Sequence, residues 1–343
     1  MKIFKILLIN FLIFISTFFL IEIFFGYWFD QDNLGPYMRE HRMKKNSFSI
    51  KFEDNVYDFI YKRNYYGFRG EDINLKDIKI VLVGGSTADE RYKPYEFTIA
   101  GLLSERLGKK ITNAGIEGQS TVGHIFNFES WFSKLKEFNP EYFIFYIGIN
   151  DHMRDVKDIK ESLDGHVLNP SRLELFKDNI KSRSLFYDYL RKIKHKYYLN
   201  TKKTISYDFD YGIKNYYKEK EFDFLNYDQA IKIYNISELK ISYEILIKSY
   251  LNNIDKLVKL SKKYNAKPIF INQVMHDGSN NKKLFILNYS LIEHCKNKKY
   301  DCIDLVSELK GEKNYWWDGV HTTPVGSRAI VEIIYPKLAS FLN

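Results

Sequence analysis

Apolar runs and amphipathic segments alternate along most of the chain. Short, nearly continuous apolar runs that suit strands cover 78–84, 111–114, 142–148, 267–272 and 301–305. Segments with the character of helices lie near 96–108, 121–138, 238–264, 282–298 and 324–342. Such alternation is typical of a parallel sheet with helices on both faces. The pattern therefore predicts an α/β fold built on a five-stranded parallel sheet.

The chain opens with an apolar stretch. Residues 6–29 carry one charge, Glu22, and a helix of about 20 residues is enough to cross a bilayer. Lys2 and Lys5 precede the stretch, which favours a cytoplasmic amino end at 1–5 and places the rest of the chain outside. Glu22 lies towards the outer end, where a charge costs less than at mid-bilayer. We therefore expect a single-pass transmembrane anchor at 6–29.

A cleaved signal peptide is the alternative interpretation of this stretch. Such a peptide ends in a cleavage site of small residues. Here the bulky side chains of Tyr27, Trp28 and Phe29 occupy that place. The sequence favours an uncleaved anchor, with the remaining domain periplasmic or extracellular.

Two segments do not follow the alternation. Residues 30–76 are polar and aromatic, and we expect them to form a stalk and an approach to the sheet. Residues from about 155 to 236 are rich in Lys, Tyr, Asp and Asn and interrupt the domain expected over 77–342. This insertion follows the strand predicted at 142–148, at the end of the sheet where functional loops collect. It is expected to be a lid or a substrate-binding cap, with ordinary packing of its tyrosines as the alternative.

The composition limits the classes of ligand and partner that the protein is expected to bind. The net charge is +9, but the lysines are dispersed and no nucleic-acid-binding motif is present, so we expect no nucleic-acid partner. Cys295 and Cys302 are the only cysteines; a disulfide and a pair of free thiols both remain open. No cofactor or metal is expected, because four histidines lack partners at ligand spacing: His166, His195, His276 and His294.

Four short polar motifs carry the candidate chemistry. Two of them, 84–87 (Gly-Gly-Ser-Thr) and 148–151 (Gly-Ile-Asn-Asp), end or directly follow apolar strand runs. The others are 113–118 (Asn-Ala-Gly-Ile-Glu-Gly) and 318–321 (Asp-Gly-Val-His), the latter just before the last helix. Open α/β sheets bind ligands at the carboxyl ends of their strands. Each motif alone also suits a turn or a helix cap, but the combination predicts one shared site.

The residue types in these motifs suit acyl transfer. A serine hydroxyl needs a base within hydrogen-bond reach, and His321 could take the proton of Ser86. Asp318, three residues before His321, could orient the imidazole and stabilise its charged form. The Ser86 N–H, a glycine N–H of 113–118 and the side-chain amide of Asn150 could bind the developing oxyanion.

The four motifs resemble those of the SGNH, or GDSL-like, hydrolase superfamily. By motif position, Gly118 corresponds to the oxyanion glycine of that family, with Gly115 as second choice, and Gly115 and Asp151 are expected to support the site. The first block commonly reads Gly-Asp-Ser, and here Gly85 replaces the Asp. Residues 64–70 (Asn-Tyr-Tyr-Gly-Phe-Arg-Gly) are similar to a segment that precedes the first block in bacterial members. The resemblance covers about 77–342 and implies a three-layer α/β/α, flavodoxin-like fold.

The resemblance and the expected anchor together predict a membrane-anchored serine esterase outside the cytoplasm. Its expected substrate is an acylated glycan of the cell envelope, or another small ester, from which it would remove an O-acyl group, expected to be acetyl. Three alternatives remain open. The same site could serve an O-acetyltransferase or a lipase or lysophospholipase, or the fold could belong to a non-catalytic glycan-binding protein. The oligomeric state is not predicted.

Overall fold

The computed structural model describes most of the chain. The described residues are 2–29, 34, 38, 41–42, 44–154, 172–201, 204–218 and 221–342. Parts of the expected stalk at 30–76 and of the expected insertion, chiefly 155–171, therefore lie outside the described residues, and so does His166.

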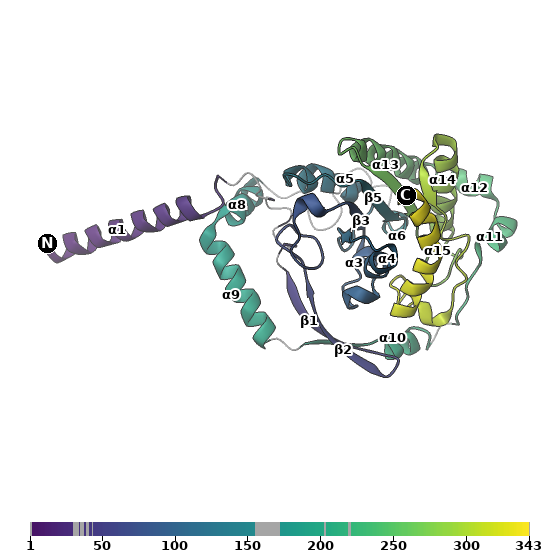
Figure 1. The fold of residues 1–343 in the computed structure, drawn as a ribbon, viewed down its shortest axis with the longest axis horizontal. Coiled ribbons are helices and arrows are strands. Elements are labelled where there is room, and N and C mark those ends of the chain that lie inside the picture. Colours follow the sequence, from purple (N-terminus) through teal and green to yellow (C-terminus); the bar gives the residue numbers. More distant parts are fainter. Residues whose placement is uncertain are drawn as a thin grey trace.

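A five-stranded parallel sheet forms the centre of the fold (Figure 1). Its strands are β3 (Ile80–Gly84), β4 (Ile111–Asn113), β5 (Tyr142–Ile147), β7 (Lys267–Asn272) and β8 (Asp301–Ile303). The spatial order is β4-β3-β5-β7-β8, and every neighbouring pair is parallel. This is the flavodoxin-like order of doubly wound α/β folds. The predicted fold class and all five predicted sheet strands are confirmed.

Helices cover both faces of this sheet. Successive residues of β3 point to opposite faces. Val81 and Val83 belong to a core that includes α5 (Thr121–Ser130) and α13 (Glu244–Lys262). Ile80 and Leu82 belong to a second core, which includes α4 (Ile99–Leu107) and α15 (Pro324–Leu342). Helix α14 (Lys282–Lys298) contributes side chains to both cores. The sheet is therefore the middle of three layers.

Two predicted helices are shorter than the sequence suggested. The helix expected at 121–138 ends at Ser130, because the next residue, Trp131, leaves helical geometry and buries its ring against Phe68. The helix expected at 238–264 is two helices, α12 (Ile236–Ser242) and α13, with Tyr243 between them. Helix α12 packs on α14, whereas α13 packs on both α14 and α5.

A second, three-stranded sheet stands beside the main one. Strands β1 (Lys45–Phe52) and β2 (Asn55–Lys62) form an antiparallel hairpin, and β6 (Ile205–Asp208) pairs parallel to β1. Residues 45–62 of the expected stalk and approach segment are thus a hairpin, which was not predicted from the sequence. Because β6 comes from the expected insertion, two segments far apart in the chain share this sheet.

The remaining elements comprise two longer helices, α8 and α9, and several short ones. They are η1 (Leu75–Asp77), α3 (Ser86–Asp89), η2 (Tyr95–Phe97), η3 (Phe132–Lys134), α6 (Ile149–His152), α8 (Arg172–Arg183), α9 (Leu185–Thr201), α10 (Phe209–Tyr216), α11 (Tyr227–Ile233) and η4 (Lys313–Tyr315). Helices α8 to α11 and strand β6 all lie within the expected insertion.

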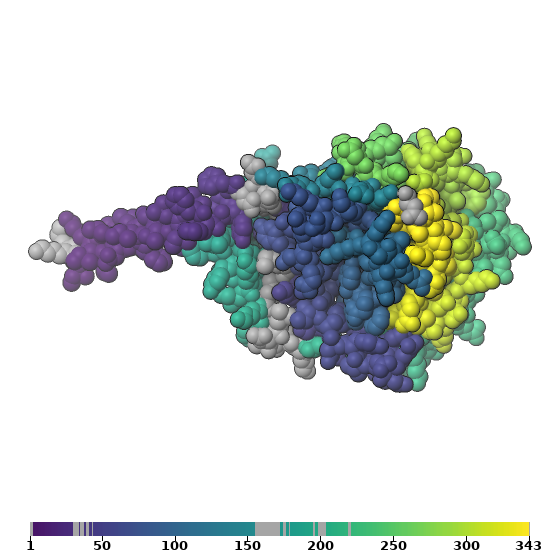
Figure 2. Space-filling model, viewed as in Figure 1, coloured from purple at the N-terminus to yellow at the C-terminus, as the bar shows by residue number. Residues whose placement is uncertain are grey.

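The amino-terminal helix α1 (Lys2–Phe25) projects away from the rest of the molecule (Figures 1 and 2). Within its segment Ile3–Phe25, a window of 18 residues has a mean hydropathy of 2.5 and is almost entirely exposed. It is long and apolar enough to span a membrane, although an amino-terminal signal sequence has the same properties. The helix begins and ends four residues earlier than the stretch 6–29, and its end coincides with Gly26, a residue type that disfavours helix continuation.

The two cysteines are bonded to each other. Cys295 lies near the end of α14 and Cys302 in β8, with 6.2 Å between their Cα atoms. Of the two states that the sequence left open, the structure has the disulfide. It closes the turn between the helix and the edge strand of the sheet.

Candidate active site

Three neighbouring strands deliver three of the four motifs to one edge of the sheet. Strand β3 ends at Gly84, and α3 begins two residues later with Ser86. Strand β4 leads into 113–118, and β5 leads through Gly148 into α6, which carries Asn150. Gly148 has a φ of 129°, a conformation that favours glycine, so the sharp turn from strand to helix depends on it.

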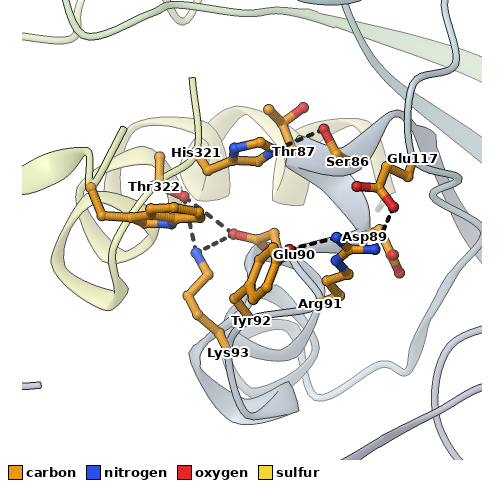
Figure 3. A pocket seen from close by; sticks show the side chains of 11 residues that line it. Ser86, Thr87, Asp89, Glu90, Arg91, Tyr92, Lys93, Glu117, His321 and Thr322 are labelled. Carbon is orange, nitrogen blue, oxygen red and sulfur yellow. Dashed lines mark hydrogen bonds and ion pairs between the residues drawn. The ribbon is translucent and has the colours of Figure 1, made fainter. Parts of the chain in front are cut away.

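The fourth motif meets the first in a line of hydrogen bonds, of which Figure 3 shows the contact between His321 and Ser86. The Oγ of Ser86 lies 2.8 Å from Nε2 of His321, although 235 residues separate them. On the other side of the ring, Nδ1 of His321 lies 2.7 Å from Oδ2 of Asp318. A hydroxyl, an imidazole and a carboxylate in this order can pass a proton from the hydroxyl to the ring.

The carboxylate of Asp318 is held by its own turn. Its Oδ1 accepts hydrogen bonds from the backbone N–H groups of Val320, at 2.8 Å, and His321, at 2.6 Å. Burial raises the pKa of Asp318, but the hydrogen bonds and charge interaction with His321 and the backbone donors outweigh it, so the pKa is lowered from its usual value. Asp318 is therefore charged near neutral pH and directed at one ring nitrogen.

Asn150 links the loops that follow β4 and β5. Its Nδ2 donates to the carbonyl oxygen of Gln119 at 2.7 Å, and Nδ2 carries a second hydrogen. A Cβ atom on Gly85 would lie only 2.1 Å from this nitrogen, so the Asn150 amide packs directly against the residue before Ser86. Gly118, with a φ of 77°, directly precedes Gln119. The structure thus brings Ser86, Asn150 and 118–119 together.

The other two predicted residues brace these loops. The N–H of Gly115 donates to Oδ1 of Asn113 at 2.8 Å, which engages this donor and leaves Gly118 as the better candidate oxyanion glycine. Asp151 is buried, and its Oδ1 accepts from the N–H of Thr121 at 3.1 Å and its hydroxyl at 2.6 Å. Burial raises the pKa of Asp151 to about 6. Asp151 ties the Asn150 loop to the start of α5.

A buried ion pair beneath the site was not predicted from the sequence. Nζ of Lys93 lies 2.5 Å from Oε1 of Glu90, and both side chains are almost fully buried. The same Nζ lies 3.0 Å from the hydroxyl of Thr322 (Figure 3). It also lies 2.5 Å from the hydroxyl of Ser327. Glu90 directly follows α3, and Thr322 directly follows His321. The pair therefore fastens the Ser86 segment to the His321 segment.

Gln273 makes a second unpredicted link. Its Nε2 donates to the hydroxyl of Thr87 at 2.8 Å, and its Oε1 accepts from the N–H of Ile149 at 2.8 Å. Thr87 follows Ser86 and Ile149 precedes Asn150, so one buried amide joins the segments after β3 and β5. A polar pair, Asn272 and Gln273, directly after an apolar strand run was the sequence signal that could have revealed it.

A small pocket opens beside Ser86 and His321 (Figure 3). Its volume is about 20 Å³, roughly the space of one water molecule or a methyl-sized group. Around it, Arg91 forms an ion pair with Glu117 at 2.5 Å. The ring of Trp317 stacks on His321 at 5.5 Å between centroids. The pocket is thus bounded by charged and aromatic side chains.

The insertion supplies part of the surroundings of the His321 turn. Tyr207 of β6 lies edge-to-face against Trp317, with 4.6 Å between ring centroids. The hydroxyl of Tyr216 in α10 lies 3.1 Å from Nε2 of His276, whose Nδ1 lies 2.9 Å from the carbonyl oxygen of Gly319. Gly319 lies between Asp318 and His321, so the insertion contacts the turn that presents both. Within the described part of the chain, no group of three or more His, Cys, Asp or Glu could hold a metal ion.

Comparison with known proteins finds similar solved structures. No family model matches the chain, and no curated protein matches it significantly. A psychrotrophic esterase from a Pseudoalteromonas species is 11% identical, with 77% of this chain and 98% of the other covered and a TM-score of 0.42. A member of the lipolytic G-D-S-L family from Veillonella parvula is 12% identical, with coverages of 76% and 97% and a TM-score of 0.42. A GDSL-like lipase from Bacteroides thetaiotaomicron is 14% identical, with coverages of 79% and 92% and a TM-score of 0.39.

These similarities are too low to assign a substrate or a reaction. The stronger observations are internal to the chain: the strand order, the motifs at the strand ends, and the hydrogen bonds from Ser86 through His321 to Asp318. The chain therefore has a parallel sheet of flavodoxin-like strand order, with a Ser–His–Asp line of hydrogen bonds at the carboxyl ends of its strands.

Proposed function

We propose that the chain is a serine hydrolase of ester bonds that works through an acyl-enzyme. The observation that carries the proposal is the continuous hydrogen-bonded line of Ser86, His321 and Asp318, with distances of 2.8 and 2.7 Å. A serine, a histidine and an ionised aspartate in such a line are the arrangement that activates a serine hydroxyl.

In the first half-reaction, Oγ of Ser86 attacks the ester carbonyl carbon while Nε2 of His321 takes its proton. The tetrahedral intermediate collapses, its bond to the leaving alcohol breaks, and His321 returns the proton to that alcohol. Water then repeats the sequence on the acyl-enzyme and releases the acid. Asp318 stays ionised throughout and stabilises the charged imidazole, as its lowered pKa allows.

The oxyanion of each intermediate needs donors that are already in place. We assign this role to the N–H of Ser86, the N–H of Gly118 and the second hydrogen on Nδ2 of Asn150. Support comes from the close packing of Asn150 against Gly85 and from its bond to Gln119, the neighbour of Gly118. Asp151 and Gln273 hold the loops that carry these donors.

The acyl group is proposed to be acetyl, and the alcohol part a carbohydrate of the cell envelope. The pocket beside Ser86 holds about 20 Å³, which suits a methyl group better than a long acyl chain. Trp317 and Tyr92 offer aromatic faces, and Arg91 and Glu117 offer hydrogen-bonding groups at the same pocket. Aromatic faces beside charged groups suit the alternating apolar and hydroxyl surfaces of sugar rings.

We place the catalytic domain outside the cytoplasm, held by α1 as an uncleaved anchor. The apolar segment Ile3–Phe25 is long enough for a span. The disulfide between Cys295 and Cys302 supports an oxidising compartment. The expected boundaries are retained in this proposal: 1–5 cytoplasmic, an anchor at 6–29, a connecting segment at 30–76 and a hydrolase domain over 77–342.

A fluorophosphonate probe and acetylated envelope polysaccharide test the proposal together. The purified full chain should be labelled by the probe and should release acetate, whereas Ser86→Ala should do neither. Labelling that persists in Ser86→Ala would identify another nucleophile and overturn the assignment. Acetyl transfer to an added glycan, in place of acetate release, would instead identify an acetyltransferase that uses the same site.

A further inference from the structure

Helix α9 has one apolar side that is exposed. Phe186, Leu190, Ile193 and Tyr197 recur at intervals of three and four residues and so share one side of the helix. Tyr189 borders them on the same side. Leu190 is 62%, Ile193 48% and Tyr197 64% exposed. These side chains form a contiguous exposed apolar arc, and such surfaces mark interaction sites.

Basic residues flank the apolar arc. Helix α9 has four Lys or Arg residues and one acidic residue, Asp188. Asp188 is buried on the opposite side, where it pairs with Arg191 at 3.0 Å and Lys192 at 2.9 Å. Lys194 and Lys196 are exposed beside the apolar arc. A helix with an apolar face between lysines is typical of a helix that lies in a membrane interface.

The start of α9 is fixed to the outer end of α1. The carboxylate of Glu22 accepts hydrogen bonds from the first backbone N–H groups of α9, of Leu185 at 2.9 Å and Phe186 at 3.3 Å. A carboxylate at the amino end of a helix accepts hydrogen bonds from the free backbone N–H groups there. Its negative charge also interacts favourably with the positive end of the helix dipole. The ring of Phe18 stacks on that of Phe186, with 4.1 Å between centroids. Glu22, the one charge of the apolar stretch, therefore has a structural partner.

The direction of α9 suits a membrane surface. From its contact with α1, α9 runs across the direction of α1 along the near side of the domain (Figure 1). If α1 crosses a bilayer, a helix that leaves its outer end crosswise follows the bilayer surface. The neighbouring α8 adds exposed Leu173 and Phe176.

We infer that α9 lies in the outer interface of the bilayer that α1 spans, with its apolar arc at the acyl boundary and its lysines among anionic lipid headgroups. The inference rests on the proposed anchor. It also has a consequence for the candidate site. Shortly after α9 the chain enters β6, whose Tyr207 packs on Trp317 beside His321. The membrane contact would thus fix the orientation of one wall of the pocket.

Depth-dependent quenching in reconstituted full-length protein tests the inference. An environment-sensitive fluorophore is attached to Ile193→Cys, and the matched control carries it at Ile241→Cys on α12, where the side chain is also exposed. The native cysteines are disulfide-bonded and leave the new thiol as the target. Vesicles of phosphatidylcholine with phosphatidylglycerol contain lipids with a spin label near the headgroup. Emission at position 193 should fall about twofold or more, with little change at position 241.

The possible outcomes test the membrane contact of α9 separately from the proposed anchor and from the proposed hydrolase activity. Intact mass and flotation with the vesicles report whether α1 is retained, and fluorophosphonate labelling reports the active site independently. If the intact chain floats but quenching is weak at both positions 193 and 241, the inference is overturned. The apolar arc would then be a binding surface for a protein partner. If the quenching at 193 is equal in vesicles of phosphatidylcholine alone, the role of the lysines is overturned.

Discussion

Replacing Asp318 by Asn separates the charge of this residue from its place in the turn. Oδ1 of Asp318 accepts from two backbone N–H groups, and Oδ2 faces Nδ1 of His321 at 2.7 Å. In Asp318→Asn the amide oxygen can keep both backbone bonds, so the amide nitrogen will face Nδ1. Nδ1 must then act as an acceptor, and the ring proton moves to Nε2. His321 can no longer take the proton of Ser86.

The expected loss is large because the wrong tautomer removes the general base. Such a change lowers kcat by about 10⁴-fold in a working triad, which corresponds to about 5 kcal/mol in the activation barrier. KM should change little, because Asp318 does not face the pocket beside Ser86. Steady-state hydrolysis of p-nitrophenyl acetate and the rate of fluorophosphonate labelling would both measure the loss.

The chain offers a matched control in another aspartate–histidine pair. Oδ1 of Asp255 on α13 lies 2.8 Å from Nε2 of His294 on α14. Asp255→Asn should leave kcat within about twofold of the original value, since neither residue lines the candidate site. A kcat for Asp318→Asn within about tenfold of the original value, in protein with unchanged thermal stability, would refute the proposed role of the triad.

Three further changes probe the loops around Ser86. Asn150→Ala should lower kcat by about 10²–10³-fold by removing an oxyanion donor. Gly85→Ala places a Cβ 2.1 Å from Nδ2 of Asn150 and should lower kcat about tenfold or more; the double variant should be little worse than Asn150→Ala, and additive losses would contradict the coupling. Burial raises the pKa of Asp151 to about 6, so its contribution to stability is present below about pH 4 and is lost as the pH rises through about 6. Between about pH 4 and pH 7, the free energy of unfolding of Asp151→Asn should therefore rise by about 3 kcal/mol relative to that of the original protein, as measured by urea unfolding. If the two proteins show the same dependence of stability on pH, this prediction is contradicted.

The main sheet was predictable because its strands are buried on both faces. All residues of β3 and most residues of β5 are buried, and such strands read as short apolar runs without alternation. The bounds of α14 were also predictable, since Asn281 caps its first turn by accepting from the N–H of Leu284. The second sheet was missed because its strands are only partly buried and β6 has four residues.

The motifs of the candidate site were predictable from the sequence. The side chains that hold these motifs in place were less predictable. Ser86, Asn150 and His321 could be placed from strand ends and motif spacing alone. The ion pair of Glu90 with Lys93 could not, because its other partners, Thr322 and Ser327, are more than 220 residues away in the chain. Only the folded arrangement shows why two charges are buried beneath the nucleophile segment. Similarly, the charge of Glu22 is unfavourable within an apolar helix, but in the structure its carboxylate caps the amino end of α9.

The replacement of the Asp of the common Gly-Asp-Ser block by Gly85 has a steric explanation. The amide of Asn150 lies where any Cβ on residue 85 would be, and the carbonyl of Gln119 lies 3.1 Å from the same point. A side chain at 85 would have to displace Asn150 from its bond with Gln119. Glycine therefore allows the loops after β3, β4 and β5 to pack closely. The absence of a side chain at position 85 thus leaves Asn150 in its bond with Gln119, and Ser86, His321 and Asp318 remain hydrogen-bonded to one another.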